Sequence, residues 1–325
     1  MVEEDCTVRA VNLTKYYGQL LAVDHIDFEV RKGEVFGFLG PNGAGKTTTV
    51  RMLTTLLTPS EGTAIIQGHD ILKDPYGARE SVGCVPETSN IYVELSAWQN
   101  LVFSAELYGV PRRVRGQRVE ELLRRLGLWE RRRSRALDFS KGMRRRLTIA
   151  MALIHRPAVL FLDEPTAGLD VQSSILIRNM VRELHSGGAT IFLTTHQMEE
   201  ANQMCDRVAI INRGRIACVD APERLRQAIE EVRSVAVSFE GGREELLQEL
   251  SALDGVIELR KDGDKLRLFT SDPGALIPLV VDAARRHGAR LVSLNTLAPS
   301  LEDVFVKVTG LDVGSPAGGG GHEMA

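Results

Sequence analysis

Eight consecutive residues near the start of the chain have the composition of a phosphate-binding loop. The segment Gly40-Pro41-Asn42-Gly43-Ala44-Gly45-Lys46-Thr47 matches the pattern G-x-x-x-x-G-K-[ST]. Glycines let the backbone turn its N–H groups toward phosphate oxygens, and Lys46 supplies positive charge for the β- and γ-phosphates. The hydroxyl of Thr47 is placed to bind Mg²⁺, and Thr48 is included in the binding segment. The pattern predicts a site for a nucleoside triphosphate.

The sequence on either side of this loop distinguishes a phosphate-binding site from an ordinary glycine-rich turn. Residues 35–39 form a nearly continuous apolar run, which is typical of a parallel strand buried on both faces. A helix is expected after the loop, and the positive end of its dipole favours an anion. A glycine-rich turn without chemistry is the alternative, but the pattern in this strand-to-helix context favours phosphate binding.

Two acidic residues follow a second apolar run. Residues 159–162 read as a buried strand, and Asp163 and Glu164 come directly after it. Ligands of parallel sheets bind beyond the carboxyl ends of the strands. Asp163 therefore fits a role in Mg²⁺ coordination, and Glu164 fits a general base that polarises the attacking water. A solvated loop or a helix cap is the alternative interpretation, and the presence of the phosphate loop favours the catalytic one.

The composition is that of an ordinary globular protein. The chain has 325 residues, of which 43% are hydrophobic and 26% charged, and its net charge is −3. These values predict about two domains and argue against a protein that coats polyanions. The longest apolar runs are about seven residues, whereas a membrane-spanning helix needs about twenty, and the acidic start does not resemble a secretory signal. The four cysteines lie far apart and are predicted to be reduced, mostly buried thiols.

Alternation of strands and helices predicts the domain organisation. Up to residue 220 the buried runs are separated by helix-length segments, so a parallel α/β sheet is expected. Residues 221–310 read as a second domain, with strands at 234–239, 256–259, 266–269 and 291–294 and helices at 244–253 and 275–286. This βαββαβ order indicates a ferredoxin-like domain. Residues 311–325 are expected to form a flexible tail.

Several further motifs carry a family resemblance. The segments Phe139-Ser140-Lys141-Gly142-Met143, Leu162-Asp163-Glu164-Pro165-Thr166, Ala167-Gly168-Leu169-Asp170 and Thr195-His196 resemble, in order and spacing, the motifs of ATP-binding cassette (ABC) transporter ATPases. The resemblance covers roughly residues 7–220. The segment 299–305 is similar to the C-terminal extension of the daunorubicin-resistance type of ATP-binding subunit.

The resemblance implies a fold for the whole chain. Residues 1–220 are expected to form a P-loop ABC ATPase domain of the α/β class, with a parallel-sheet core, an antiparallel β subdomain and a helical subdomain at about residues 90–155. The small ferredoxin-like α+β domain at 221–310 follows it. Its role in bracing a dimer or in regulation is a hypothesis.

The same resemblance implies roles for individual residues. Two cassettes close head to tail on ATP, so Ser140 and the Gly142 amide would bind the γ-phosphate of the nucleotide held by the other subunit. His196 would contact the γ-phosphate, although a lone histidine after a strand is commonly structural. Tyr17 matches the aromatic residue that stacks on adenine, with Tyr16 as the competitor.

Three positions depart from the usual family pattern. Glu87 stands where most relatives carry glutamine, so it either contacts Mg²⁺ and the attacking water as a charged ligand or lies outside the site. Lys141 stands where glycine is usual and Met143 where glutamine is usual. Because Ser140 and Gly142 are intact, hydrolysis is expected to survive, and Lys141 is a candidate for added positive charge near the γ-phosphate.

A basic segment lies between the phosphate loop and Asp163. Residues 111–146 contain 14 Lys or Arg and four acidic residues. Three interpretations stay open: a solvated helical surface, a patch beside a membrane partner and its anionic lipids, or a nucleic-acid footprint. No series of aromatic residues accompanies the charge, so nucleic acid is not the expected partner.

Together these features predict an ATP-hydrolysing subunit of an ABC transporter. It is expected to dimerise with itself or a homologous subunit and to drive a separate polytopic membrane permease that exports a drug-like or lipid-like molecule. Its expected location is cytoplasmic and peripheral, on the inner face of the cell membrane. A non-transport ABC ATPase acting on ribosomes or DNA is the first alternative, but such proteins usually carry two cassettes or a long coiled-coil insertion. A nucleotide-regulated binding module with negligible turnover is the second.

Overall fold

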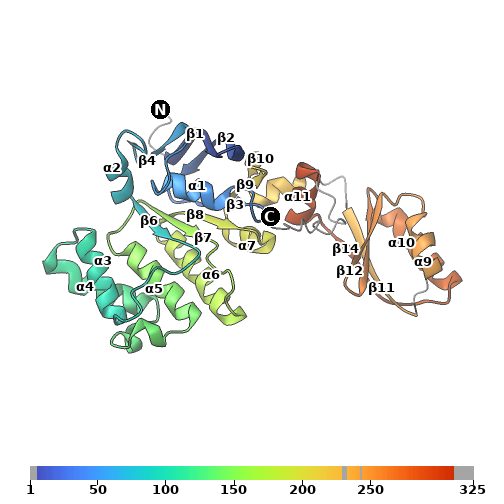
Figure 1. Ribbon diagram of the computed structural model, residues 1–325. Helices are drawn as coiled ribbons and strands as arrows, with labels where there is room; N and C mark the ends of the chain where they lie inside the picture. Colours follow the sequence, from blue (N-terminus) through green and yellow to red (C-terminus); the bar gives the residue numbers. More distant parts are fainter. Residues whose placement is uncertain (1–5, 229–232, 242–243, 311–325) are drawn as a thin grey trace, which may run out of the picture. The chain divides into compact units, whose positions relative to one another are not determined.

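The computed structural model describes residues 6–228, 233–241 and 244–310 of the chain. The chain divides into two compact units, Met1–Pro222 and Glu223–Ala325 (Figure 1). The expected boundary at residue 220 lies close to this division. The predicted tail, residues 311–325, lies outside the described residues.

A six-stranded sheet forms the centre of the first unit, with the strand order β10-β9-β3-β8-β7-β6. Its strands are β3 Val35–Leu39, β6 Val82–Val85, β7 Val159–Asp163, β8 Thr190–Thr195, β9 Arg207–Asn212 and β10 Arg215–Asp220. The pairs β3-β8, β3-β9, β6-β7 and β7-β8 are parallel, and only β9-β10 is antiparallel. Every residue of β3, β7 and β8 is buried, as expected for strands covered on both faces. The predicted parallel sheet is confirmed.

An antiparallel sheet with the order β2-β1-β4-β5 lies beside it. Its strands are β1 Cys6–Tyr17, β2 Leu20–Arg31, β4 Glu61–Ile66 and β5 His69–Asp70. In the second half of β2 the buried residues alternate with exposed ones, so one face of the strand is apolar. That face joins the core between the two sheets, where Phe28 packs against Phe36, Phe38 and Phe192.

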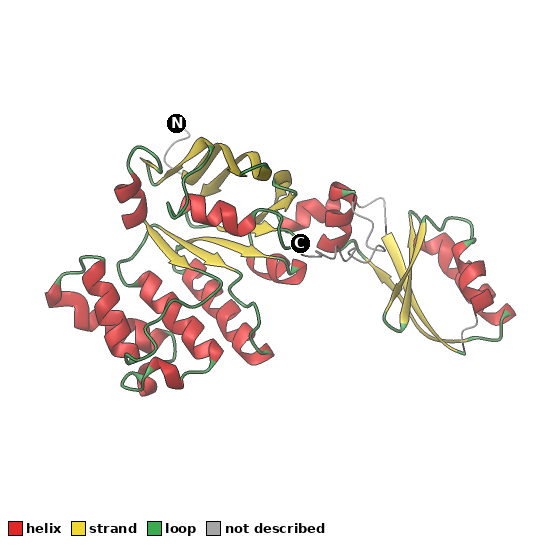
Figure 2. Cartoon of the chain, viewed as in Figure 1, coloured by secondary structure: helices red, strands yellow, loops and turns green. Residues whose placement is uncertain are grey.

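Helices of this unit contact the two sheets, and three of them lie in the segment between β6 and β7. They are α1 Lys46–Leu53, α2 Pro75–Glu80, α3 Ala97–Leu107, α4 Arg112–Arg125, α5 Lys141–Leu153, α6 Val171–Ser186 and α7 Met198–Met204, with 3₁₀ turns η1 Trp129–Arg131 and η2 Ala136–Asp138. Figure 2 shows α3, α4 and α5 gathered in a helical group below the central sheet. A capping box at Ser96 starts α3, and buried Val119, Leu122 and Leu123 form the inner face of α4.

We expect Phe192→Leu to destabilise this unit by about 1–2 kcal/mol, because a smaller side chain leaves part of an aromatic cluster unfilled. The Phe192 ring is fully buried, and its centroid lies 5.2 Å from that of Phe161 and 5.5 Å from that of Phe38. The urea midpoint of unfolding measures the loss. Leu56→Ala is the control, since Leu56 is 70% exposed and its truncation should shift the midpoint very little.

The second unit contains a four-stranded antiparallel sheet with the order β12-β13-β11-β14. Its elements are α8 Pro222–Gln227, β11 Arg233–Glu240, α9 Glu244–Ser251, β12 Glu258–Asp262, β13 Lys265–Thr270, α10 Pro273–Arg286, β14 Arg290–Leu297 and α11 Leu301–Thr309. From β11 to β14 the order is the predicted βαββαβ. The strand expected at 256–259 instead spans Glu258–Asp262, because Asp262 pairs with Lys265 and only two residues form the turn.

The cysteines are less buried than predicted, since three of the four are partly exposed. Cys205 is buried, whereas Cys6, Cys84 and Cys218 are partly exposed. Cys84 and Cys218 lie on β6 and β10, the edge strands of the central sheet, where cover is incomplete. Burial still raises the pKa of Cys84 to about 11, so this thiol is protonated at neutral pH.

In the part of the chain that the structure describes, none of the helices is long and apolar enough to cross a membrane.

Candidate active site

The phosphate loop connects β3 to α1 and depends on glycines for its shape. Gly43 has φ 78° and Gly45 has φ 106°, a region that side chains rarely adopt. A Cβ atom on Gly40 would lie 2.3 Å from the carbonyl oxygen of Ile211. Gly45 is the N-cap of α1, and no side chain caps this helix, so its first N–H groups are available to an anion.

Lys46 is a buried cation at the first position of α1, with only 5% of its surface exposed. Its ammonium donates hydrogen bonds to the carbonyl oxygens of Gly40 at 2.7 Å and Pro41 at 3.2 Å. The Nζ atom also lies 3.2 Å from Oε1 of Glu164. The loop therefore holds the positive charge against its own backbone, next to the end of β7.

Asp163, the last residue of β7, is held by two hydroxyl groups. Its Oδ1 accepts a hydrogen bond of 2.6 Å from Thr194 Oγ1 and one of 3.3 Å from Thr47 Oγ1. Thr194 lies on the neighbouring strand β8, and Thr47 on α1. The two residues predicted to bind Mg²⁺ from separate motifs are thus within hydrogen-bond distance of each other.

Glu164 adopts a backbone conformation that is rare for residues with a side chain. Its φ is 46°, and its N–H donates to the carbonyl oxygen and the hydroxyl of Thr194 at 3.2 and 3.0 Å. The carboxylate is 7% exposed. Oε2 lies 2.9 Å from Nδ1 of His196, whereas Oε1 accepts no hydrogen bond from the described residues, although Lys46 is at ion-pair distance.

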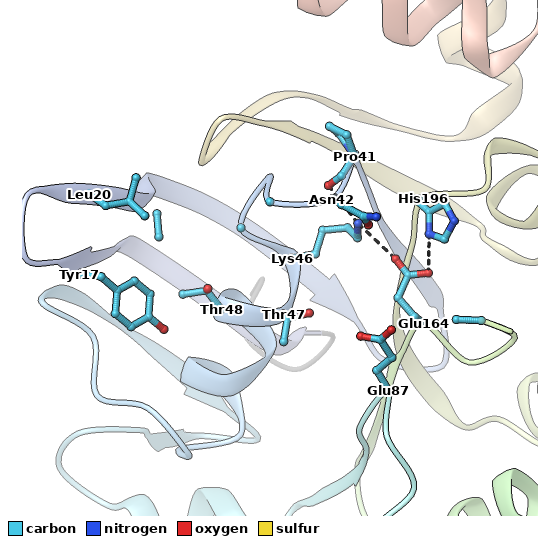
Figure 3. A pocket seen from close by; sticks show the side chains of 14 residues that line it. Tyr17, Leu20, Pro41, Asn42, Lys46, Thr47, Thr48, Glu87, Glu164 and His196 are labelled. Carbon is cyan, nitrogen blue, oxygen red and sulfur yellow. Dashed lines mark hydrogen bonds and ion pairs between the residues drawn. The ribbon is translucent and has the colours of Figure 1, made fainter. Parts of the chain in front are cut away.

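Lys46, Thr47, Glu164 and His196 line one cavity of about 340 Å³. Figure 3 shows Tyr17 and Leu20 at one end of it and Glu87, Glu164 and His196 at the other, with Lys46 and Thr47 toward the acidic end. The full lining consists of Tyr17, Leu20, Ala22, Pro41, Asn42, Gly43, Gly45, Lys46, Thr47, Thr48, Glu87, Glu164, Ala167 and His196.

Most of the residues predicted from the sequence meet in this cavity, and five do not line it. Gly40, Ala44 and Asp163 lie buried behind its wall. Ser140 and Gly142 lie elsewhere, at the start of α5. Tyr17 lines the cavity with 44% of its surface exposed, and its competitor Tyr16 does not line it.

The start of α5 is closely packed against the loop that follows β7. Ser140 is the N-cap and accepts a hydrogen bond of 3.2 Å from the N–H of Met143. A Cβ atom on Gly142 would lie 2.4 Å from Ser173 Oγ, and one on Gly168 would lie 2.3 Å from Lys141 Nζ. The amine of Lys141 therefore lies over Gly168 of the same chain.

Arg145 is a functional candidate that the sequence analysis missed. The segment 111–146 was interpreted as surface or interface, but Arg145 is only 4% exposed. Its guanidinium donates to five backbone carbonyls, those of Pro86, Glu87, Asp163, Glu164 and Pro165. Burial lowers the pKa of this arginine, and the charge of Asp163 opposes that effect. One side chain on α5 thus connects the segments that carry Glu87 and Glu164.

We expect Arg145→Lys to lower turnover about tenfold and the free energy of unfolding by about 1–3 kcal/mol, because a single ammonium cannot replace a planar fork that donates to five carbonyls of two segments. Steady-state ATPase assays and urea unfolding measure the two effects. Arg113→Lys is the matched control, because Arg113 is exposed on α4. Unchanged turnover in Arg145→Lys would show that hydrolysis does not depend on the link that Arg145 makes between the Glu87 and Glu164 segments.

The other arginines of the segment form a surface with internal pairs. Arg115, Arg124 and Arg125 form ion pairs with Glu106, Glu120 and Glu183. The guanidinium groups of Arg124 and Arg132 lie 4.1 and 4.2 Å from the ring centroid of Trp129. Such pairs reduce the charge that remains for an external partner.

A second cavity of about 720 Å³ lies between the Glu87 segment, α5 and the loop after β7. Its wall combines apolar side chains with cations and hydroxyl groups. The lining residues are Glu87, Thr88, Ser89, Ile91, Val93, Phe139, Lys141, Arg144, Arg145, Ala167, Gly168 and Leu169. Glu87 and Ala167 line both cavities.

The phosphate loop, the parallel sheet and the acidic end of β7 define a P-loop nucleotide-binding protein of the α/β class. Comparison with known proteins agrees with this class. The family described as "ABC transporter" matches residues 23–167. The "Nod factor export ATP-binding protein I" of Cupriavidus metallidurans is 39% identical over 93% of this chain and 97% of that protein.

A daunorubicin resistance ATP-binding protein of Streptomyces coeruleorubidus is 36% identical over 95% of this chain and 97% of its own length. The solved structure of an ATP-binding subunit of an ABC transporter is 30% identical, covers 69% of this chain and 93% of its own, and superposes with a TM-score of 0.63. The chain belongs to the family of ATP-binding subunits of ABC transporters, and it is an ATPase that binds nucleotide.

Proposed function

We propose that the 340 Å³ cavity binds ATP and that Glu164 activates the water for its hydrolysis. The acceptor Oε1 of Glu164 carries this proposal, because it is buried at the wall of the cavity that the phosphate loop forms and, among the described residues, has only the ammonium of Lys46 at ion-pair distance. A carboxylate oxygen has more than one lone pair, so Oε1 can accept a hydrogen bond from a water while it faces Lys46, and that water is itself polarised. The neighbouring ammonium of Lys46 pairs with this carboxylate and would stabilise the negative charge of the γ-phosphate.

The oxygen atoms at the acidic end of the cavity fit Mg²⁺, which prefers hydroxyl, carboxylate and water ligands. Thr47 and Asp163 would hold the ion, and Glu87 lines the same wall. When bound, Mg²⁺ neutralises charge on the β- and γ-phosphates. In this arrangement Glu87 serves as a charged ligand in the place of the usual glutamine.

The remaining residues of the cavity suit the two ends of the nucleotide. His196 stands beside Glu164, so its ring reaches the γ-phosphate and orients the carboxylate. Tyr17 lies at the opposite end, where its exposed ring provides a stacking surface for adenine (Figure 3). The backbone of residues 41–45 and the hydroxyl of Thr48 lie between these ends, at the phosphates.

The family model that matches this chain is that of ABC transporters. We propose a head-to-tail dimer of this chain, or of the chain and a homologous subunit. Ser140 and Gly142 support it, because they form the N-terminus of the 13-residue helix α5 and do not line the cavity of their own chain. In the dimer they would contact the γ-phosphate held by the other subunit. Lys141 would then add charge to that contact.

The names of the relatives indicate export, so the proposed task is to power export of a drug-like or lipid-like molecule through a separate polytopic permease. The subunit would lie on the cytoplasmic face of the membrane, attached through that permease. We propose the second cavity as the docking place, because its wall includes the Glu87 segment and α5. A docked segment there would act on the loops that Arg145 connects to Glu164.

Copurification from native membranes tests this function. The tagged full chain, purified in mild detergent, should bring down a polytopic membrane protein in stoichiometric amount, identified by mass spectrometry. Val93→Asp should abolish this copurification, because it places a charge on the apolar wall of the second cavity. Leu56→Asp, at an exposed site outside both cavities, is the matched control. Recovery of ribosomes or DNA-repair proteins instead would refute the transport function and leave the ATPase.

A further inference from the structure

Glu200 is a buried carboxylate that the proposed chemistry does not use. It lies on α7, is 2% exposed and does not line the nucleotide cavity. Within the described residues, no lysine or arginine forms an ion pair with it. A buried acidic group without a cation must be stabilised by hydrogen bonds.

Two threonine hydroxyls supply these bonds. Thr166 Oγ1 donates to Oε1 of Glu200 at 2.6 Å, and Thr195 Oγ1 donates to Oε2 at 2.5 Å. Both threonines are buried, and both distances are at the short end of the range for hydroxyl hydrogen bonds. Thr195 Oγ1 also accepts a hydrogen bond of 3.0 Å from the N–H of Gln197, so its hydroxyl hydrogen is directed at Glu200.

The two threonines belong to the segments that carry Glu164 and His196, the two residues proposed above for catalysis and called the catalytic pair here. Thr166 lies two residues after Glu164, with Pro165 between them, and Thr195 directly precedes His196. The side chains of Glu164 and His196 meet at 2.9 Å. The Glu200 carboxylate is therefore a second bridge between the same two segments, made from outside the cavity.

We propose that Glu200 is a positioning residue for ATP hydrolysis, which fixes the loop after β7 to the end of β8 and so holds Glu164 and His196 together. This inference rests on the roles proposed above for these two residues. Because Glu200 does not line the cavity and its hydrogen bonds go to Thr166 and Thr195 rather than to the phosphate loop, its loss should change the orientation of Glu164 and His196 and leave nucleotide binding intact.

The chemistry of the bridge requires a carboxylate. Both of its oxygens accept, and each threonine donates. In Glu200→Gln the amide keeps the shape, but its NH₂ group faces one hydroxyl, which must then accept instead of donate. In Glu200→Ala both of the hydrogen bonds that Glu200 accepts are lost, and the two buried threonine hydroxyls are left without this acceptor.

ATPase kinetics of the full chain test the proposal. We expect kcat to fall about 3- to 10-fold in Glu200→Gln and about 100-fold in Glu200→Ala, with the KM for ATP within about twofold of wild type, because small misplacement of catalytic groups is costly to the chemical step. Glu199→Gln is the matched control, since Glu199 is the exposed neighbour on the same helix and loses the same charge. It should keep wild-type kcat.

A double-variant comparison separates positioning from simple packing. If Glu200 acts through the catalytic pair, Glu200→Gln should cost little further kcat in a His196→Ala background, where the pair is already broken. Equal losses in both backgrounds, a raised KM at unchanged kcat, or wild-type kcat in Glu200→Gln would each overturn the proposal. If Glu200→Ala does not fold, the kinetics of Glu200→Gln alone test the proposal. A different result separates this proposal from the proposed function on which it rests. If Glu164→Gln retains turnover, the role proposed for Glu164 is wrong, and the proposal for Glu200 fails with it.

Discussion

Glu164→Gln should abolish ATP turnover, with a loss of about 100- to 1000-fold, while the protein still binds ATP. The amide is close in shape to the carboxylate but does not accept a proton, so the attacking water is no longer polarised. Glu164 is 7% exposed and, within the described residues, its Oε1 faces only the ammonium of Lys46, so this one carboxylate accounts for the expected loss. Phosphate release at saturating Mg-ATP measures it.

The same variant should accumulate as an ATP-bound dimer. Glu164 Oε1 lies 3.2 Å from Lys46 Nζ, and the neutral amide competes less for that ammonium. The phosphates therefore meet a cation with fewer partners, and without hydrolysis they keep the two chains together. Light scattering after size exclusion, with and without Mg-ATP, detects the dimer.

The control for Glu164→Gln is Glu29→Gln, which makes the same change of charge at an exposed position of β2. It should keep wild-type turnover. Wild-type turnover in Glu164→Gln would eliminate Glu164 as the base, and a variant that stays monomeric at saturating Mg-ATP would contradict the head-to-tail dimer. Negligible turnover in the wild-type chain would favour a nucleotide-regulated binding module.

Lys46→Ala is expected to weaken ATP binding by about 2 kcal/mol or more, which is about 30-fold in Kd. The ammonium is the one charged group that the phosphate loop itself contributes, and its backbone contacts hold it at the loop. Displacement of a fluorescent nucleotide measures the affinity. Lys73→Ala, at an exposed position before α2, is the matched control and should bind ATP as wild type does.

Stability and affinity are separable in this experiment. Lys46→Ala leaves the Glu164 carboxylate buried without its cation, so the fold is expected to lose stability as well. The double variant Lys46→Ala with Glu164→Gln removes both charges, and it should regain stability without regaining affinity. If the double variant binds ATP as tightly as wild type, the assignment of Lys46 to the phosphates is wrong.

Local patterns were sufficient for the strands and the loop of the nucleotide site. The apolar runs before Gly40 and Asp163 predicted buried parallel strands, and β3 and β7 are buried at every residue. Two of the three glycines of the loop, Gly43 and Gly45, have the positive φ that glycine adopts at no steric cost, and a Cβ atom on the third, Gly40, would lie 2.3 Å from the carbonyl oxygen of Ile211. The apolar runs and the loop motif consist of residues adjacent in the chain, so a single sequence encodes them fully.

Contacts between distant segments were not predictable in this way. Arg145 was one of 14 basic residues in its segment, and only folding places it within reach of both Pro86 and Pro165. Glu200 is one of two adjacent glutamates on α7, and burial separates it from its exposed neighbour. Cys84 and Cys218 were expected inside, but their strands became the edges of the sheet.

The sequence by itself determined the class of the protein, the phosphate loop with Lys46 and Thr47, and the acids Asp163 and Glu164, because each is encoded by neighbouring residues whose types and spacing suffice for the chemistry. The tertiary structure decided which groups meet: Glu164 with Lys46 and His196, and Arg145 with the carbonyls around Glu87. The reason is that strand order and helix packing, set by burial over the whole unit, bring together residues that are distant in the chain. Thr47 and Asp163 are 116 positions apart, and Glu164 and His196 are 32 apart.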